Sequence, residues 1–343
     1  MTEPQKPLVR QELDRPSAGP GEALLEVVGC GLCHTDIGFW EGGVRTRHPL
    51  PLALGHEISA RVVETGEGAE DWQGKEVVVP AVLPCGECEL CQNGRENACQ
   101  HQSMPGNDFH GGFASHLVVP VKWLVDAGRL PVGIDLAEVS VLADAVTTPY
   151  QAMKRAQVQN GDAVILIGAG GIGSFGVQIA SAFGAKVIAV DIQDSRLERA
   201  AAFGADGVVN TQGMDLKTAR GAVRDTCRQV GFPKVGLKVL EMSGTPAGQS
   251  LAWSLLSPAG IVGIVGFCMD RVPVRLSNLM AFDAEAFGNW GCSPRLYGPA
   301  LDLVRQGKVQ LTPFIKRFPM DAINQVFEEV RAHQITERPV LLP

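Results

Sequence analysis

The sequence predicts a two-domain protein in which a β-rich domain accompanies an α/β domain with a doubly wound parallel sheet. Short apolar runs bounded by glycine fill the first part of the chain, whereas strand and helix patterns alternate from residue 161 to about residue 295. The length of 343 residues agrees, because it exceeds that of a usual single domain.

The β-rich domain is expected over residues 1–145. Its clearest strands are the runs EALLEVVG (22–29), ISARVVETG (58–66) and GKEVVVPA (74–81). The last segment, 296–343, carries a strand, a turn and an amphipathic helix pattern in GKVQLTPFIKRFPMDAINQVFEEVRAH. We expect this segment to return to the β-rich domain.

The α/β domain is expected over residues 146–295. The continuous apolar run Val164–Ile167 is typical of a strand buried on both faces of a parallel sheet. A helix should follow and end at Gly184, because apolar residues recur at helical spacing: Ile172, Phe175, Ile179 and Phe183. Further strands are predicted at 186–190, 237–240 and 261–265.

Composition excludes several classes of partner. The chain is 45% hydrophobic and 20% charged, with a net charge of −7, so as a whole it does not attract nucleic acid or an anionic membrane. The first residues lack the apolar core of a signal peptide, and the apolar stretch 163–190 contains six glycines. We therefore expect a cytoplasmic protein, in which clustered thiols bind metal more readily than they form disulfides.

Four cysteines, Cys85, Cys88, Cys91 and Cys99, follow the spacing C-x2-C-x2-C-x7-C. The short gaps turn successive sulfurs toward one point, and the longer gap returns a fourth, as a closed structural zinc site requires. An iron–sulfur cluster or free thiols are the alternatives, although the fourth gap and the following Gln100 do not fit the usual iron–sulfur pattern.

A glycine-rich turn follows the strand at 164–167 and precedes the predicted helix. Its G-x-G-x-x-G pattern, with Asp191 at the end of the next strand, predicts a Rossmann dinucleotide site. Asp191 would bind the ribose hydroxyls and repel a 2′-phosphate, which favours NAD over NADP. A Rossmann unit that binds no dinucleotide is the alternative. The residues assigned to the cofactor are Gly168, Gly170, Gly171, Ile172, Gly173, Asp191 and Arg196.

A second set of metal-binding residue types lies in GCGLCHTD and LALGHE, where it comprises Cys33, Asp36, His56 and Glu57. Together with the four-cysteine stretch, GGFASHLVVP and GAGGIG, these motifs resemble the zinc-dependent alcohol dehydrogenases of the medium-chain dehydrogenase/reductase family. The resemblance spans nearly the whole chain. It implies a GroES-like catalytic domain, a Rossmann domain, NAD and two zinc ions per chain.

The resemblance also implies residue roles. Cys33 and His56 would bind catalytic zinc, Glu57 would lie beside the metal, and Asp36 would orient the histidine. The family usually has a cysteine where DAVTTPY places Asp144, and aspartate is itself a zinc ligand. We therefore expect Asp144 to be the third ligand, and the alternative is that Glu57 supplies it while Asp144 lies beside the metal.

The implied reaction is oxidation of an alcohol that binds at the open zinc position and gives up hydride to the nicotinamide. Thr35 would accept the hydroxyl proton, and Thr148 would pack against the nicotinamide. Many members continue the proton relay to a histidine three residues after the threonine, but this chain has Gly38 there.

Less generic stretches, among them GVRTRHPLPLALGHE, MPGNDFHGGFASHLVVP and RLSNLMAFDAEAFGNWGC, resemble family members that oxidise a ring alcohol of a cyclohexene-carbonyl-CoA thioester in anaerobic aromatic degradation. Arg45, Arg47 and His48 would then bind the phosphates of this small-molecule acyl-CoA substrate. We expect a homo-oligomer, a tetramer or dimer, since bacterial members of the family are commonly tetramers. The alternatives are a zinc-dependent polyol, sugar or other secondary alcohol dehydrogenase, a zinc-free quinone reductase, and a catalytically silent zinc protein.

Overall fold

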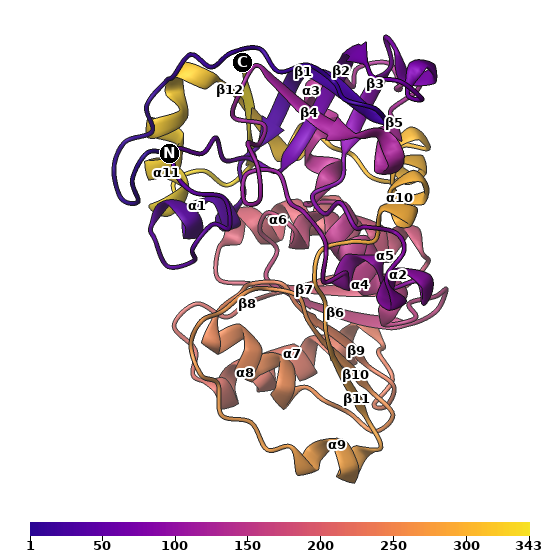
Figure 1. Cartoon of the computed structure of the whole chain (residues 1–343). Helices are drawn as coiled ribbons and strands as arrows, with labels where there is room; N and C mark the ends of the chain where they lie inside the picture. Colours follow the sequence, from indigo (N-terminus) through magenta and orange to yellow (C-terminus); the bar gives the residue numbers. More distant parts are fainter. The chain divides into compact units, whose positions relative to one another are not determined.

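A computed structural model describes residues 1–343 and divides them into two compact units. Unit 1 comprises Met1–Thr147, Gly291–Arg305 and Leu311–Pro343, and unit 2 comprises Thr148–Trp290 and Gln306–Gln310. Each unit is built on its own sheet, and the strand labels in Figure 1 follow the chain from β1 to β12.

Unit 2 contains a six-stranded sheet in the order β11-β10-β9-β6-β7-β8, in which every neighbouring pair is parallel. The chain winds outward from β6 in both directions, so the predicted doubly wound α/β fold is confirmed. The strands are β6 (Ala163–Ile167), β7 (Lys186–Asp191), β8 (Gly207–Asn210), β9 (Lys238–Glu241), β10 (Ile261–Ile264) and β11 (Glu285–Gly288).

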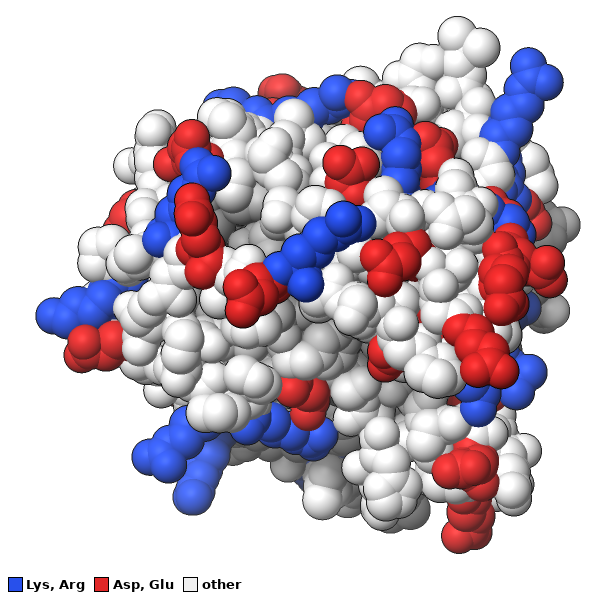
Figure 2. All heavy atoms as spheres, turned by 45° about the horizontal axis from the view of Figure 1, so that its top comes forward, with Lys and Arg blue, Asp and Glu red and all other residues white.

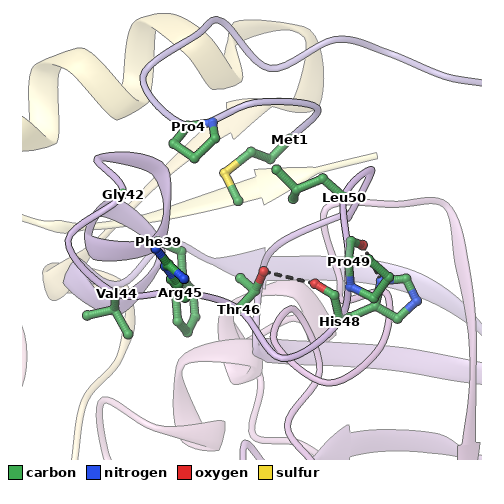
Figure 3. A pocket seen from close by; sticks show the side chains of 10 residues that line it. All are labelled: Met1, Pro4, Phe39, Gly42, Val44, Arg45, Thr46, His48, Pro49 and Leu50. Carbon is green, nitrogen blue, oxygen red and sulfur yellow. Dashed lines mark hydrogen bonds between the residues drawn. The ribbon is translucent and has the colours of Figure 1, made fainter.

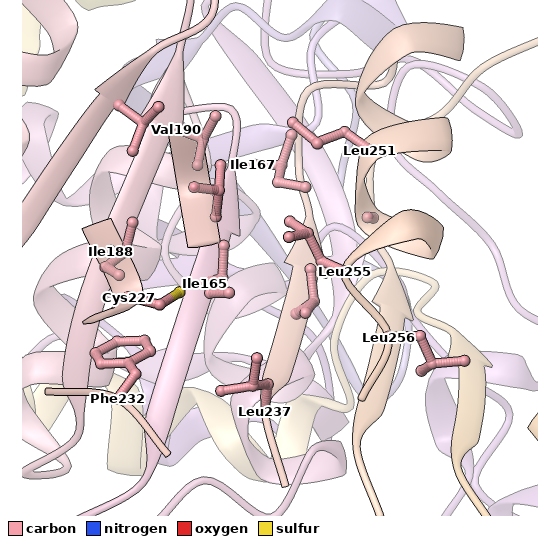
Figure 4. Close-up of a cluster of buried hydrophobic side chains, with 14 of the residues drawn as sticks. Ile165, Ile167, Ile188, Val190, Cys227, Phe232, Leu237, Leu251, Leu255 and Leu256 are labelled. Carbon is pink, nitrogen blue, oxygen red and sulfur yellow. The ribbon is translucent and has the colours of Figure 1, made fainter. Parts of the chain in front are cut away.

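Helices connect these strands and cover the sheet. They are α4 (Thr147–Arg155), α5 (Gly173–Ala182), α6 (Asp194–Ala202), α7 (Leu216–Val230), α8 (Pro246–Ser254) and α9 (Ser277–Phe282). Figure 4 shows Ile165, Ile188 and Val190 of the sheet with Cys227 of α7 and Leu251 of α8, all of them in one buried cluster. Alternate residues of β6 face opposite sides of the sheet, and all of them are buried. The strand is therefore covered on both faces, as its continuous apolar run predicted.

Unit 1 contains a mostly antiparallel seven-stranded sheet in the order β12-β13-β1-β2-β3-β5, with β4 paired to β1. Its strands are β1 (Glu22–Gly31), β2 (Glu57–Thr65), β3 (Glu76–Val79), β4 (His116–Pro120), β5 (Val125–Asp126), β12 (Ile315–Pro319) and β13 (Arg338–Leu342). The three predicted runs correspond to β1, β2 and β3. The sequence did not predict β13, because its run RPVLL contains proline and lacks the polar alternation of a surface strand.

Short helices complete unit 1. The α-helices are α1 (His34–Trp40), α2 (Glu89–Gln92), α3 (Leu136–Val139), α10 (Tyr297–Arg305) and α11 (Ile323–Arg331). The 3-10 helices are η1 (Glu70–Trp72), η2 (Glu96–Ala98), η3 (Val121–Trp123), η4 (Ser140–Ala143), η5 (Pro294–Leu296), η6 (Thr312–Phe314) and η7 (Met320–Ala322). The predicted amphipathic helix is α11, which buries Val326, Phe327 and Val330. None of the helices is both long and apolar enough to cross a bilayer.

Candidate metal centres and dinucleotide site

The four clustered cysteines, which we call the lobe (residues 85–99), bring their sulfurs to one point. The Sγ atoms of Cys88 and Cys91 are 3.5 Å apart, those of Cys88 and Cys99 3.7 Å, and those of Cys85 and Cys91 3.9 Å. Four sulfurs at the usual zinc–sulfur distance lie about 3.8 Å apart in a tetrahedron. The spacing of the sulfurs therefore fits a closed four-thiolate zinc site.

Backbone N–H groups of the lobe point at these sulfurs. The amide of Cys88 donates to Cys85 Sγ at 3.3 Å, and the amide of His101 donates to Cys99 Sγ at 3.3 Å. Hydrogen bonds from the amides of Glu87 and Cys88 lower the pKa of Cys85 to about 6, whereas burial raises the pKa of Cys91 to about 12. A bound cation would offset the repulsion among four thiolates in this setting.

Buried Glu96 anchors the lobe to the rest of unit 1. Its carboxylate accepts from Ser293 Oγ at 2.9 Å and forms an ion pair with Arg295. Glu96 is thus a structural group. On the face drawn in Figure 2, acidic and basic side chains are interspersed and form no broad basic field.

A second cluster gathers residues from separate parts of unit 1. Cys33 precedes α1, His56 and Glu57 lie at the start of β2, and Asp144 follows η4. One ligand atom from each lies within 4.8 Å of the others. The sulfur of Cys33 is 3.6 Å from Asp144 Oδ2, and His56 Nε2 is 3.8 Å from the same oxygen. Sulfur, imidazole and carboxylate together make a donor set that fits zinc.

Asp36 supports this cluster from the first turn of α1. One oxygen accepts from the amide of Cys33 at 3.0 Å, and the other accepts from the amide of Gly55 at 3.1 Å and lies 3.3 Å from His56 Nδ1. Burial opposes a charged imidazole, but the Asp36 carboxylate outweighs it and raises the pKa of His56 well above its usual value. The negative charges that favour this proton would equally favour a metal cation in its place.

Glu57 has a partner that the sequence did not reveal. Arg338 of β13 donates from Nε to Glu57 Oε2 at 3.0 Å and from Nη2 to the other oxygen, and both side chains are buried. Burial raises the pKa of Glu57, and the charge of Arg338 opposes that shift. The only signal in the sequence was an arginine at the start of an apolar run, RPVLL, which does not identify its partner.

The backbone before Asp144 is fixed by a buried tyrosine. Tyr297 donates its hydroxyl to the carbonyl of Ala143 and accepts from the amide of Ala81 at 3.1 Å. Thr147 donates to the same Ala143 carbonyl at 3.2 Å. Burial raises the pKa of Tyr297 well above its usual value, so the phenol stays a neutral donor. Asp144 therefore projects from a segment with little freedom to shift.

The glycine turn of unit 2 lies between β6 and α5, as the sequence predicted. Gly168 has a φ of 92°, and a Cβ built at Gly173 would come within 1.7 Å of the Gly168 carbonyl oxygen, so both positions need glycine. Gly170, Gly171 and Ile172 complete the turn, whose amides lead into the amino terminus of α5. A pyrophosphate fits such a backbone cradle.

Asp191 and Arg196 flank this turn. Asp191 accepts from the amide of Ala169 at 2.8 Å through Oδ2 and from the amides of Ile192 and Gln193 through Oδ1. Arg196 Nη1 lies 3.8 Å from Asp191 Oδ1, and its Nε is buried without a hydrogen-bond partner. A buried guanidinium donor beside the glycine turn fits an anionic, hydroxyl-bearing ligand such as a dinucleotide.

The remaining predicted residues lie in different places. The Thr35 hydroxyl is 3.7 Å from Cys33 Sγ, at the second metal cluster. Thr148 belongs to unit 2, where its carbonyl accepts from Asn289 at 3.3 Å. Arg47 forms an exposed ion pair with Asp108 at 3.3 Å.

Arg45 and His48 line a pocket of about 290 Å³ together with Thr46, Phe39 and Leu50 (Figure 3). Thr46 Oγ1 donates to the carbonyl of His48 at 3.0 Å, and His48 Nδ1 lies 2.6 Å from the carbonyl of Pro49. The Arg45 side chain is exposed. The pocket thus combines an apolar wall with a cationic group.

Comparisons with known proteins agree with this arrangement. Residues 19–129 match the alcohol dehydrogenase GroES-like domain, and residues 171–306 match the zinc-binding dehydrogenase domain. An alcohol dehydrogenase of Geobacillus stearothermophilus is 30% identical over 339 residues, which cover 98% of this chain and 96% of that protein.

Two solved structures have the same fold. Galactitol-1-phosphate dehydrogenase from Escherichia coli superposes with a TM-score of 0.87 at 25% identity, covering 99% of this chain and 98% of that one. Acetophenone reductase from Geotrichum candidum, solved in complex with NAD, gives a TM-score of 0.82 at 27% identity, covering 96% and 92%.

The fold and the two donor sets define a zinc-binding dehydrogenase. The chain belongs to the zinc-dependent medium-chain alcohol dehydrogenase family. The predicted fold class, a GroES-like domain with a Rossmann domain, is confirmed. The predicted activity class is confirmed as well: the protein is an alcohol dehydrogenase that uses zinc and NAD and acts on a small molecule.

Proposed function

We propose that this enzyme oxidises the ring alcohol of 6-hydroxycyclohex-1-ene-1-carbonyl-CoA to 6-oxocyclohex-1-ene-1-carbonyl-CoA with NAD, in anaerobic aromatic degradation. The observation that carries the alcohol dehydrogenase chemistry is the mixed donor set in unit 1, one ligand atom each from Cys33, His56 and Asp144. Three protein donors leave a fourth position on zinc for a substrate oxygen. The acyl-CoA assignment rests on the resemblance of the less generic stretches.

The third ligand in this proposal is Asp144 rather than Glu57. Both oxygens of Glu57 are already engaged by the buried guanidinium of Arg338. Asp144 Oδ2 lies 3.6 Å from Cys33 Sγ and 3.8 Å from His56 Nε2, distances that two ligands of one tetrahedral ion would have. The lobe cysteines, Cys85, Cys88, Cys91 and Cys99, hold the second, structural zinc.

The dinucleotide in this proposal is NAD, held by the turn at 168–173 and by Asp191. No arginine or lysine stands at positions 192 and 193, directly after Asp191, to receive a 2′-phosphate. Arg196 lies alongside with its buried Nε free for the cofactor. Asp191 retains one acceptor site on Oδ2 for a ribose hydroxyl, because that oxygen accepts only the amide of Ala169.

The residues around the second cluster of unit 1 have different roles in the proposed reaction. When bound, zinc supplies a Lewis acid that lowers the pKa of the substrate hydroxyl, and NAD supplies the hydride acceptor. Thr35 accepts the hydroxyl proton, since its Oγ1 lies at the rim of the donor set, 3.7 Å from Cys33 Sγ. Asp36 orients the imidazole of His56, and Arg338 binds the carboxylate of Glu57 so that it does not compete with the substrate for zinc. In unit 2, Thr148 would be the residue that packs against the nicotinamide.

The pocket at Arg45, Thr46 and His48 supports an anionic substrate. Arg45 is exposed and lines the pocket beside the apolar Phe39 and Leu50, a combination that suits the phosphates and pantetheine of CoA. Arg47 contributes less charge in this proposal, because Asp108 neutralises it. The pocket begins on α1, the same helix that follows Cys33 and carries Thr35.

A zinc-dependent polyol or sugar phosphate dehydrogenase is the second candidate. Its support is the likeness to galactitol-1-phosphate dehydrogenase, which covers nearly all of both chains. The cationic pocket would suit a sugar phosphate as well as CoA.

NADH production from a matched panel of alcohols tests the proposal. The panel holds the hydroxycyclohexenoyl-CoA thioester, its free acid, sorbitol, galactitol 1-phosphate and a simple secondary alcohol. We expect the thioester to give the highest kcat/KM, and Arg45→Ala to raise its KM about tenfold while leaving the simple alcohol unaffected. A higher kcat/KM for galactitol 1-phosphate than for the thioester would overturn the substrate assignment in favour of the second candidate.

We further propose that the enzyme is a homo-oligomer, a tetramer or dimer, in the cytoplasm. The edge strand β11 and the exposed apolar residues Phe267, Met269 and Met280 of unit 2 support association. The clustered thiols of the lobe support a reducing compartment. Light scattering after size-exclusion chromatography would test the first point, since a monomer would contradict it.

A further inference from the structure

Glu241 is a buried carboxyl group that none of the chemistry above uses. It ends β9, and it is in register with Ile167 of β6 on one side and Ile264 of β10 on the other. Its side chain is fully buried. The carboxyl ends of parallel strands are where open α/β sheets bind their ligands, so Glu241 lies beneath the cofactor edge of unit 2.

The residue ties together the turns that follow β9 and β10. Its Oε1 accepts from the amide of Ser243 at 2.7 Å, from the amide of Gly244 at 3.1 Å and from the Ser243 hydroxyl. Its main-chain carbonyl accepts from the amides of Val265 at 2.9 Å and Gly266 at 3.0 Å. Both turns therefore take their positions from this one residue.

The second carboxyl oxygen has no partner. Oε2 of Glu241 is buried without a hydrogen bond, and burial raises the pKa of this carboxyl. A Cβ built at Gly266 would come within 2.9 Å of Oε2 and 2.2 Å of the Gly244 amide nitrogen. The carboxyl group thus lies beside two turns whose backbones are in close contact. A buried polar atom left unpaired calls for an explanation beyond fold stability.

The turn after β9 also lies against the glycine turn of the cofactor site. A Cβ built at Gly168 would come within 2.6 Å of the Ser243 amide nitrogen. A displacement of the Ser243–Gly244 turn therefore changes the surface next to the phosphate cradle. Glu241 is therefore linked to the cofactor edge through the turn that its carboxyl group holds.

We propose that Glu241 is a positioning residue for the nicotinamide half of the cofactor, an inference that rests on the proposed NAD-binding function. A Rossmann sheet consists of two mononucleotide-binding halves. Strands β6–β8 carry the glycine turn and Asp191, which serve the adenosine half. Strands β9–β11 form the other half, and Glu241 sets the two turns on its carboxyl edge.

The test is a pair of titrations on the zinc-loaded full-length protein with NADH and with ADP-ribose, which lacks the nicotinamide. We compare wild type, Glu241→Ala, Glu241→Gln and Ser243→Ala. Glu138→Gln is the control, because Glu138 is a buried carboxyl of unit 1 bonded to Thr312 and Arg317. Wild-type binding of ADP-ribose is the arm that tests the proposed function by itself.

We expect Glu241→Ala to raise the Kd of NADH about tenfold and the KM of NAD in step, while the Kd of ADP-ribose changes less than about twofold. Glu241→Gln keeps an acceptor oxygen at Oε1 and should restore NADH affinity to within about threefold of wild type. Ser243→Ala should weaken NADH binding in the same direction but less. Glu138→Gln should leave both Kd values unchanged.

Three results would overturn the inference. An unchanged NADH affinity in Glu241→Ala means that the turns hold without the carboxyl group. Equal losses for NADH and ADP-ribose mean that the residue acts on the phosphate cradle that both ligands share, or on stability, and not on the nicotinamide half. If Glu241→Ala does not fold, unaltered NADH binding in both Glu241→Gln and Ser243→Ala is the contradicting result. Wild-type protein that binds neither ligand would instead contradict the proposed function.

Discussion

The two metal centres of unit 1 differ in how the chain supplies their donor atoms. The lobe takes four thiols from residues 85–99, and backbone amides of the same stretch point at the sulfurs. The second cluster takes a thiol, an imidazole and carboxylates from three distant stretches, at residues 33, 56–57 and 144. The lobe donors are alike and local, whereas those of the second cluster are mixed and distant.

This difference separates a structural centre from a catalytic one. Four thiolates complete the coordination of zinc and leave no position for a substrate. The second cluster offers three donors, from Cys33, His56 and Asp144, because the carboxylate of Glu57 is bound by Arg338. Three donors leave one zinc position for a substrate. Variants of the two centres and of their supporting residues test this distinction.

Replacement of His56 by alanine should abolish the reaction but spare the fold. The variant should retain the lobe zinc alone and lose about a thousandfold in kcat/KM, because Lewis-acid stabilisation contributes several kcal/mol. Zinc analysis and steady-state kinetics check this outcome. His116→Ala, at a histidine whose imidazole contacts Ser115, is the matched control and should keep two zinc ions. Full activity in His56→Ala would contradict the catalytic assignment.

Replacement of Cys88 by serine should have the converse effect. The variant should lose the lobe zinc and its melting temperature should fall by roughly 5 °C or more, while kcat/KM per folded molecule stays within about threefold. Thermal unfolding, zinc analysis and kinetics below the melting temperature provide the comparison. A large loss of kcat with an intact fold would mean that the lobe takes part in chemistry.

Replacement of Arg338 by methionine tests the buried pair beside the open centre. It leaves the Glu57 charge without its partner and should lower the free energy of unfolding by about 3–5 kcal/mol. The double variant Arg338→Met/Glu57→Gln removes both charges and should recover at least half of that loss. Urea unfolding of the single and double variants measures the coupling. Equal stabilities for all the variants and wild type would show that the pair contributes nothing.

Replacement of Tyr297 by phenylalanine should have the smallest effect. It removes the hydroxyl that bonds to Ala143 and Ala81, and should cost about 1–3 kcal/mol of stability because two buried backbone groups lose a partner. If this tyrosine positions Asp144, zinc should also leave the second cluster faster during dialysis, with the lobe zinc unaffected. Tyr150→Phe, at the other tyrosine of the chain, is the control. Unaltered zinc retention would limit Tyr297 to a structural role.

The local features of this protein could be read from its sequence. The lobe and the glycine turn depend on residues a few positions apart, so their spacing predicts their geometry. Strand β6 and helix α5 followed from an apolar run and a helical period. The donor types of the second cluster were predicted through the family resemblance, which their wide separation in the chain made necessary.

The contacts that adjust those donors could not be read in the same way. Glu57 and Arg338 are 281 residues apart, and Ala143 and Tyr297 are 154 apart. Such pairs depend on how β13 and α10 return to unit 1, and no local pattern encodes a partner at that distance. The unpaired oxygen of Glu241 depends likewise on the packing of two turns against each other.

Anomalous diffraction at the zinc edge from crystals of the zinc-loaded enzyme tests the central claim most directly. We expect two zinc ions per chain. One should lie among the four lobe sulfurs, and the other should lie about 2.3 Å from Cys33 Sγ and about 2.0–2.2 Å from His56 Nε2 and Asp144 Oδ2. A second zinc bound by Glu57 with Asp144 turned away, or no second zinc in active crystals, would contradict the account.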